Sequence, residues 1–128
     1  MTGNEYQEKA HAFVSGGADD MMYPLLGLAE EAGEVCGKVA KFIRKNHAWV
    51  LCDQSYLKTM RPSLEREALE KHVKLRRDIS AELGDCMWMI AEAARRFGLS
   101  LDRVMARNLR KLEDRRARGV IVGEGDAR

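Results

Sequence analysis

Cysteine, proline and aromatic residues are scarce in this sequence of 128 residues, and it has no long apolar run. The three cysteines (Cys36, Cys52 and Cys86) form no C-x-x-C pair and leave an odd number. This favours reduced thiols in a cytoplasm over a disulfide framework or a zinc site. No apolar run approaches the roughly 18 residues that a membrane-spanning helix needs. The N-terminus has neither the basic nor the apolar part of a signal peptide, so we expect a cytoplasmic protein.

The net charge is also small, at +2. This argues against a protein that binds duplex DNA, because such proteins are more often strongly basic, with an isoelectric point above about 9. The charges are nevertheless sorted along the chain. Residues 1–34 carry one base against seven acids, and residues 103–118 carry seven bases against two acids. Two interpretations remain open: solvated helix faces, or an acidic patch that holds cations facing a basic patch that holds phosphates.

Apolar residues recur at three- and four-residue steps through most of the chain, which predicts helices. Capping residues and glycines set the helix ends: a capping box at Thr2 and Glu5, an N-cap at Asp19 or Asp20, N-caps at Ser63 and Ser100, and stops at Gly98 and Gly119. The sequence therefore predicts a single domain over residues 1–128 with an all-α fold, a bundle of four to five helices. Residues 47–77 form a longer connection and residues 120–128 a tail.

Several local features carry expectations of their own. Tyr6, Phe13 and Val14 share the apolar face expected for the first helix, and a kink is expected near residues 78–80. Trp88 lies opposite the apolar stripe of its helix, which favours a subunit interface over base stacking. The region before Ser63 lacks periodicity and is expected to be a loop with apolar anchors: Trp49, Val50, Leu51, Tyr56 and Leu57.

Two pairs of carboxylates are the most informative feature. Glu31 and Glu34 lie three residues apart on one predicted helix, and Glu82 and Asp85 lie three residues apart on another. Residues at this spacing project from a helix in nearly the same direction. If the two apolar stripes pack together, four carboxylates converge, and their repulsion is relieved by bound cations. A ligand set made of oxygen alone favours Mg²⁺ or Mn²⁺ over zinc or copper.

A di-iron carboxylate bundle is the alternative metal class. Such bundles use Glu-x-x-His from two helices, and this sequence has the spacing once, at Glu8 and His11. A helical interaction module without enzymatic activity is a second alternative, since acids three residues apart are common on charged helices.

The two long strings LLGLAEEAGEVCGKVAKFIRK and AELGDCMWMIAEAARRFGLSLDRVMARNLRKLEDRRARG resemble the MazG-type all-α nucleoside triphosphate pyrophosphohydrolases. The motifs that carry the resemblance are E-x-x-E at Glu31, E-x-x-D at Glu82 and N-x-x-K at Asn108. The opening NEYQEKA and the end RGVIVGEGDAR are similar to short stand-alone members from bacteriophages. The resemblance covers about residues 4–46 and 78–128. One departure is the 47 residues that separate Glu34 from Glu82, more than in compact members.

The resemblance implies an enzyme that hydrolyses (deoxy)nucleoside triphosphates or altered nucleotides to the monophosphate and pyrophosphate with Mg²⁺, or Mn²⁺ as a substitute. It also implies a homodimer or homotetramer in a bacterial or phage-infected cell. Glu31, Glu34, Glu82 and Asp85 would hold the metal, and one of the first three would take a proton from water.

The substrate-binding candidates lie outside the acidic motifs. Lys111 and Arg115, four residues apart, are candidates for a phosphate clamp, and Tyr6 for contact with the base. Asn108 stands where the apolar stripe of the last helix expects an apolar side chain. A buried polar group there costs roughly 1–3 kcal/mol unless it is paired, so we expect either a structural hydrogen bond or a role toward the ligand.

Overall fold

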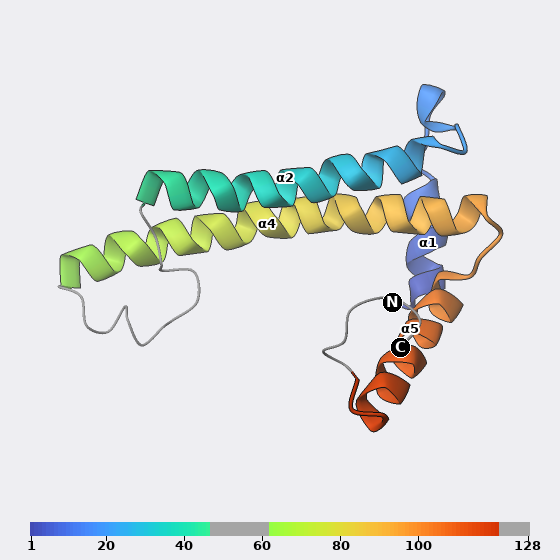
Figure 1. Ribbon diagram of the computed structural model, residues 1–128. Coiled ribbons are helices and arrows are strands. Elements are labelled where there is room, and N and C mark those ends of the chain that lie inside the picture. The colour runs from blue at the N-terminus through green and yellow to red at the C-terminus, as the bar shows by residue number, and fades with distance from the viewer. Residues whose placement is uncertain (47–61, 121–128) are drawn as a thin grey trace. The chain divides into compact units, whose positions relative to one another are not determined.

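The computed structural model describes residues 1–46 and 62–120, and within these ranges the chain forms helices and no strand (Figure 1). The all-α prediction is thus confirmed. The elements are α1 (Gly3–His11), a short 3₁₀ helix η1 (Gly16–Ala18), α2 (Tyr23–Asn46), α4 (Pro62–Arg96) and α5 (Leu101–Ala117). Within the described ranges, no helix combines the length and the apolar character needed to cross a membrane.

Contacts divide the chain into two compact units, and each is described by itself. The first unit consists of Met1–Pro24 together with Ile90–Arg128, and the second of Leu25–Met89.

The helix ends of the first unit follow the predicted local signals. The Thr2 hydroxyl accepts a hydrogen bond from the amide of Glu5 at 3.1 Å, and the Glu5 carboxylate accepts one from the amide of Thr2 at 2.8 Å. This reciprocal pair is the predicted capping box. The hydroxyl of Ser100 accepts a hydrogen bond from an amide in the first turn of α5, at 3.3 Å. Gly98 and Gly119 take φ angles of 65° and 69°, in the left-handed region that favours glycine.

A buried glutamine, Gln7, holds the first unit together and was not singled out by the sequence. Its side-chain amide donates hydrogen bonds to the carbonyl oxygens of Ala91 and Leu99, both at 3.1 Å. Its carbonyl oxygen accepts one from the amide of Leu101 at 3.3 Å. With 6% of its surface exposed, Gln7 satisfies three backbone groups of α4, α5 and the turn between them.

The expectation that Phe13 lies on the apolar face of the first helix is wrong. Helix α1 ends at His11, and the chain leaves it in a turn in which the amide of Phe13 bonds the carbonyl of Ala10 at 3.1 Å. The Phe13 ring is 78% exposed as a result. Tyr6, within the helix, is half-buried as expected.

In the second unit, α2 and α4 run antiparallel and side by side (Figure 1). Phe42 of α2 meets His72 of α4 with ring centroids 5.5 Å apart, and Met89 of α4 is only 3% exposed. A Cβ atom added at Gly27 would lie 2.7 Å from the Met89 sulfur, so glycine at this position lets the methionine pack against α2.

Helix α4 continues through residues 78–80 without interruption, and the kink expected there stays a prediction. No proline or glycine stands there to break the hydrogen-bond ladder. The side chain of the expected cap Ser63 lies outside the described part of the chain, as do the expected loop anchors: Trp49, Val50, Leu51, Tyr56 and Leu57.

Candidate metal centre

Three acidic side chains of the second unit come together between α2 and α4. Glu31 projects from α2, whereas Glu82 and Asp85 project from one turn of α4. Each offers a carboxylate oxygen, and these oxygens all lie within 4.8 Å of one another. Because α2 and α4 are antiparallel neighbours, the paired spacing on α4 directs two carboxylates toward the one on α2. We call Glu31, Glu82 and Asp85 the carboxylate group.

Glu34, the fourth predicted ligand, does not belong to the carboxylate group. It lies about one turn further along α2 and its side chain is exposed. Its negative charge nevertheless acts on the centre, because it contributes to the pKa shifts of both Glu31 and Lys38. The structure thus brings three of the four predicted carboxylates together and leaves the fourth beside them.

The electrostatics of the centre are visible in Glu31, whose pKa is raised above its ordinary value. Loss of hydration is the largest cause, and the remaining causes are the charges of acidic neighbours: Asp85, Glu34, Glu30 and Glu82. A carboxylate whose ionised form is opposed by its surroundings is stabilised by an added cation. The donor set contains oxygen alone, which suits a hard divalent ion such as Mg²⁺ or Mn²⁺.

Lys38 is a residue of this site that the sequence reasoning missed. Its ammonium nitrogen lies 2.8 Å from a carboxylate oxygen of Glu82, and the Glu82 side chain is only 12% exposed. The hydrogen bond and charge of Glu82 raise the pKa of Lys38, so the lysine stays protonated. Its position four residues after Glu34, on the same helix face, was the available signal. Lys38 therefore partly neutralises the carboxylate group.

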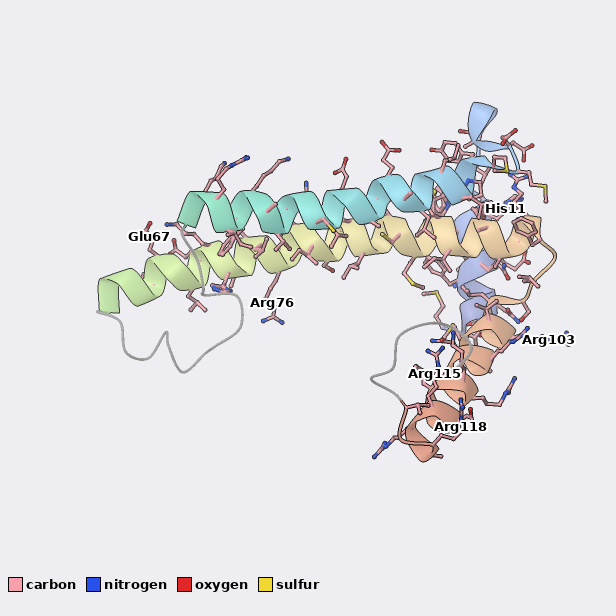
Figure 2. All side chains as sticks on the ribbon, in the orientation of Figure 1. His11, Glu67, Arg76, Arg103, Arg115 and Arg118 are labelled. Atoms are coloured by element: carbon pink, nitrogen blue, oxygen red, sulfur yellow. The ribbon has the colours of Figure 1, made fainter. Side chains whose placement is uncertain are left out.

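The substrate-binding candidates Asn108 and Lys111 lie on α5, in the first unit. Together with Val104 and Arg107 they line a shallow hollow of about 640 Å³. Asn108 is exposed, so the penalty expected for burying its amide does not arise, and it is free to meet a ligand from solvent. Arg115 projects from the same helix and is half-buried (Figure 2). Tyr6 on α1 belongs to the same unit.

The di-iron alternative depends on Glu8 and His11, and both side chains contact other residues of the first unit. A ring nitrogen of His11 lies 3.1 Å from a carboxylate oxygen of Glu92, which is 3% exposed. Glu8 accepts a hydrogen bond from Arg95 at 2.9 Å. Among the side chains that the structure places, neither Glu8 nor His11 joins a group of three potential metal ligands.

The sequence is similar to a known protein family and to a known bacteriophage protein. The family described as "MazG nucleotide pyrophosphohydrolase domain" matches residues 23–120, which contain all three members of the carboxylate group. The chain is 34% identical over 110 residues to the Gene 37 protein of Mycobacterium phage L5, covering 86% of this chain and 78% of that protein. No solved structure matches the chain significantly.

Proposed function

The chain belongs to the MazG nucleotide pyrophosphohydrolase family, and from this we propose that it hydrolyses (deoxy)nucleoside triphosphates, or altered nucleotides, to the monophosphate and pyrophosphate with Mg²⁺. The observation that carries the proposal is the carboxylate group, with oxygens of Glu31, Glu82 and Asp85 within 4.8 Å of one another. Such a group suits a divalent cation, and Mg²⁺ in proteins is usually bound by carboxylates together with the phosphates of a substrate.

In the proposed reaction a water molecule attacks the α-phosphorus. A bond forms between the water oxygen and that phosphorus, and the bond to the bridging oxygen between the α- and β-phosphates breaks. The bridging oxygen leaves with pyrophosphate, and the proton of the water passes to a carboxylate of the site. When bound, Mg²⁺ supplies charge neutralisation and lowers the pKa of water.

The protein side chains have separate parts in this proposal. Glu31, Glu82 and Asp85 hold the cation, and Glu34 adds a fourth negative charge beside it. One of these glutamates accepts the proton from water. On α5, Asn108 and Lys111 contact the phosphates or sugar from their hollow, Arg115 supports the phosphates, and Tyr6 of α1 meets the base.

We also propose that the chain acts as a homodimer or homotetramer. The α2–α4 pair leaves large apolar side chains on its surface, including Leu26 at 68% exposure and Val73 at 60%. Further exposed apolar residues on these helices support the same conclusion: Ile43, Leu69, Leu83 and Met87. Apolar surface of this kind commonly marks an interface. Light scattering behind size-exclusion chromatography measures the assembly directly, and a monomer at micromolar concentration would contradict it.

The similarity to a mycobacteriophage protein supports a role in the nucleotide pools of an infected bacterial cell. Base preference is the property to be measured first, since it depends on pocket shape.

The experiment that tests the function is a panel of nucleotides incubated with the protein and Mg²⁺, with products separated by anion-exchange chromatography. We expect equal amounts of nucleoside monophosphate and pyrophosphate from at least one nucleotide, and none from a Glu31→Gln/Asp85→Asn double variant. Formation of nucleoside diphosphate and inorganic phosphate would reject the proposal.

A further inference from the structure

A pocket lined by five lysines adjoins the carboxylate group on the α2–α4 pair. Three lysines come from α2 and two from α4: Lys38, Lys41, Lys45, Lys71 and Lys74. The pocket has a volume of about 420 Å³, within the range of small-molecule sites. Phe42 and the buried Leu75 supply its apolar lining, and Asp78 is the one acid among the lining residues. We call this site the lysine pocket.

The lysine pocket has more positive charge than its acidic neighbours neutralise. Lys71 pairs with Glu67 outside the pocket lining at 2.6 Å, and Lys74 pairs with Asp78 at 2.5 Å. Among the side chains that the structure describes, no acid forms an ion pair with Lys41 or Lys45. Several ammonium groups around one hollow repel one another, and a multiply charged anion relieves that repulsion.

Lys38 connects the lysine pocket to the carboxylate group. It lines the pocket and also lies 2.8 Å from the Glu82 carboxylate. Side chains on a helix lean toward its N-terminus. On α2 this direction leads from Lys41 and Lys45 toward the turn that carries Glu31. A ligand with one phosphate at the carboxylate group therefore has cationic surface beside it for further phosphates.

We propose that the lysine pocket binds the β- and γ-phosphates of the substrate, the part that leaves as pyrophosphate. The assignment to a leaving group depends on the function proposed above, whereas the binding of pyrophosphate itself does not. Lysine ammonium groups are compact point charges that bind phosphates well. Inorganic pyrophosphate is then a ligand in its own right and a product inhibitor, and triphosphates are bound more tightly than monophosphates.

The test measures binding of inorganic pyrophosphate to the full chain by isothermal titration calorimetry, with a chelator present to remove metal. The test variant is Lys41→Gln/Lys45→Gln, and circular dichroism confirms that it folds. The matched control is Arg44→Gln/Arg76→Gln, which removes the same charge from the same two-helix unit at exposed positions outside the pocket lining. Figure 2 shows Arg76 projecting from α4 on the side away from α2.

We expect the lysine variant to bind pyrophosphate about tenfold or more weakly, the loss that follows from removing charged hydrogen bonds, and the arginine variant to bind nearly as the wild type does. Equally weakened pyrophosphate binding in both variants would show that the effect comes from long-range charge alone, and it would overturn the proposed binding in the lysine pocket. Binding of sulfate as tight as that of pyrophosphate would also overturn it.

The same measurements separate this inference from the proposed function. If the wild type binds pyrophosphate through Lys41 and Lys45 but hydrolyses no nucleotide, the proposed function is wrong and the proposed binding in the lysine pocket is supported. If it hydrolyses nucleotides but pyrophosphate binds the lysine variant normally, the pocket fails and the function stands.

Discussion

Replacing Glu31 by Gln should stabilise the protein without metal and weaken its stabilisation by Mg²⁺. The carboxylate oxygens of Glu31, Glu82 and Asp85 lie within 4.8 Å of one another. Two unit charges at that distance in a water-like medium repel by about 1 kcal/mol. Glu31 has two such neighbours, and screening by solvent and by Lys38 reduces the sum, so we expect a gain of about 1 kcal/mol in unfolding free energy. For a chain of this size that raises the melting temperature by about 3–5 °C.

The pH dependence of this gain follows from the raised pKa of Glu31. Below the ordinary value of 4.5, Glu31 is protonated in both the folded and the unfolded state, and the wild type loses nothing. As the pH rises through the raised folded-state pKa, the wild type loses stability relative to Glu31→Gln. The advantage of the variant is therefore present near neutral pH and absent in acid.

In Mg²⁺ the wild type should become more stable than Glu31→Gln. A ligand present at 100 times its dissociation constant adds about 2.7 kcal/mol to the unfolding free energy, and the variant lacks one of three ligands. The assay is thermal unfolding with chelator or with millimolar Mg²⁺, at neutral and acidic pH. Glu70→Gln, an exposed position on α4, is the matched control. Lower stability of Glu31→Gln in chelator at neutral pH, or equal stabilisation of both proteins by Mg²⁺, would contradict a cation site at the carboxylate group.

Three further predictions concern catalysis and folding. Glu34→Gln should lower kcat about 100-fold or more while circular dichroism stays unchanged, and near-normal turnover would remove Glu34 from the site. Lys111→Ala should raise KM with kcat nearly unchanged, because it removes one substrate contact that is made equally in the ground and transition states. Wild-type kinetics in this variant would show that Lys111 is a solvated surface residue with no role in substrate binding. Gln7→Leu should lower the unfolding free energy in urea by about 2–4 kcal/mol, because it removes the hydrogen bonds that Gln7 makes with the carbonyls of Ala91 and Leu99 and with the amide of Leu101. An unchanged urea midpoint would contradict the role given to Gln7.

Local features of the fold were predictable from the sequence because they depend on residues within one turn. The Thr2–Glu5 capping box, the Ser100 cap and the glycine stops at Gly98 and Gly119 all act across three or four positions. The role of Gln7 was not predictable, because its three partners lie 84 to 94 residues away and meet it only after packing.

The chemistry of the candidate site was predictable from the sequence, but which residues form the site was predictable only in part. Spacing on α4 indicates that Glu82 and Asp85 share a direction, but only the packing of α2 on α4 decides whether Glu31 or Glu34 completes the group. The pairing of Lys38 with Glu82 likewise depends on the register of two helices separated by a long connection. Spacing alone does not encode that register.

The position of the bond broken in the nucleotide tests the proposed pyrophosphohydrolase activity most directly. Hydrolysis of a nucleoside triphosphate in ¹⁸O-labelled water, followed by mass spectrometry of both products, reports which phosphorus the water attacks. We expect one labelled oxygen in the nucleoside monophosphate and none in the pyrophosphate. Label in the pyrophosphate, or release of a nucleoside diphosphate with labelled inorganic phosphate, would contradict it.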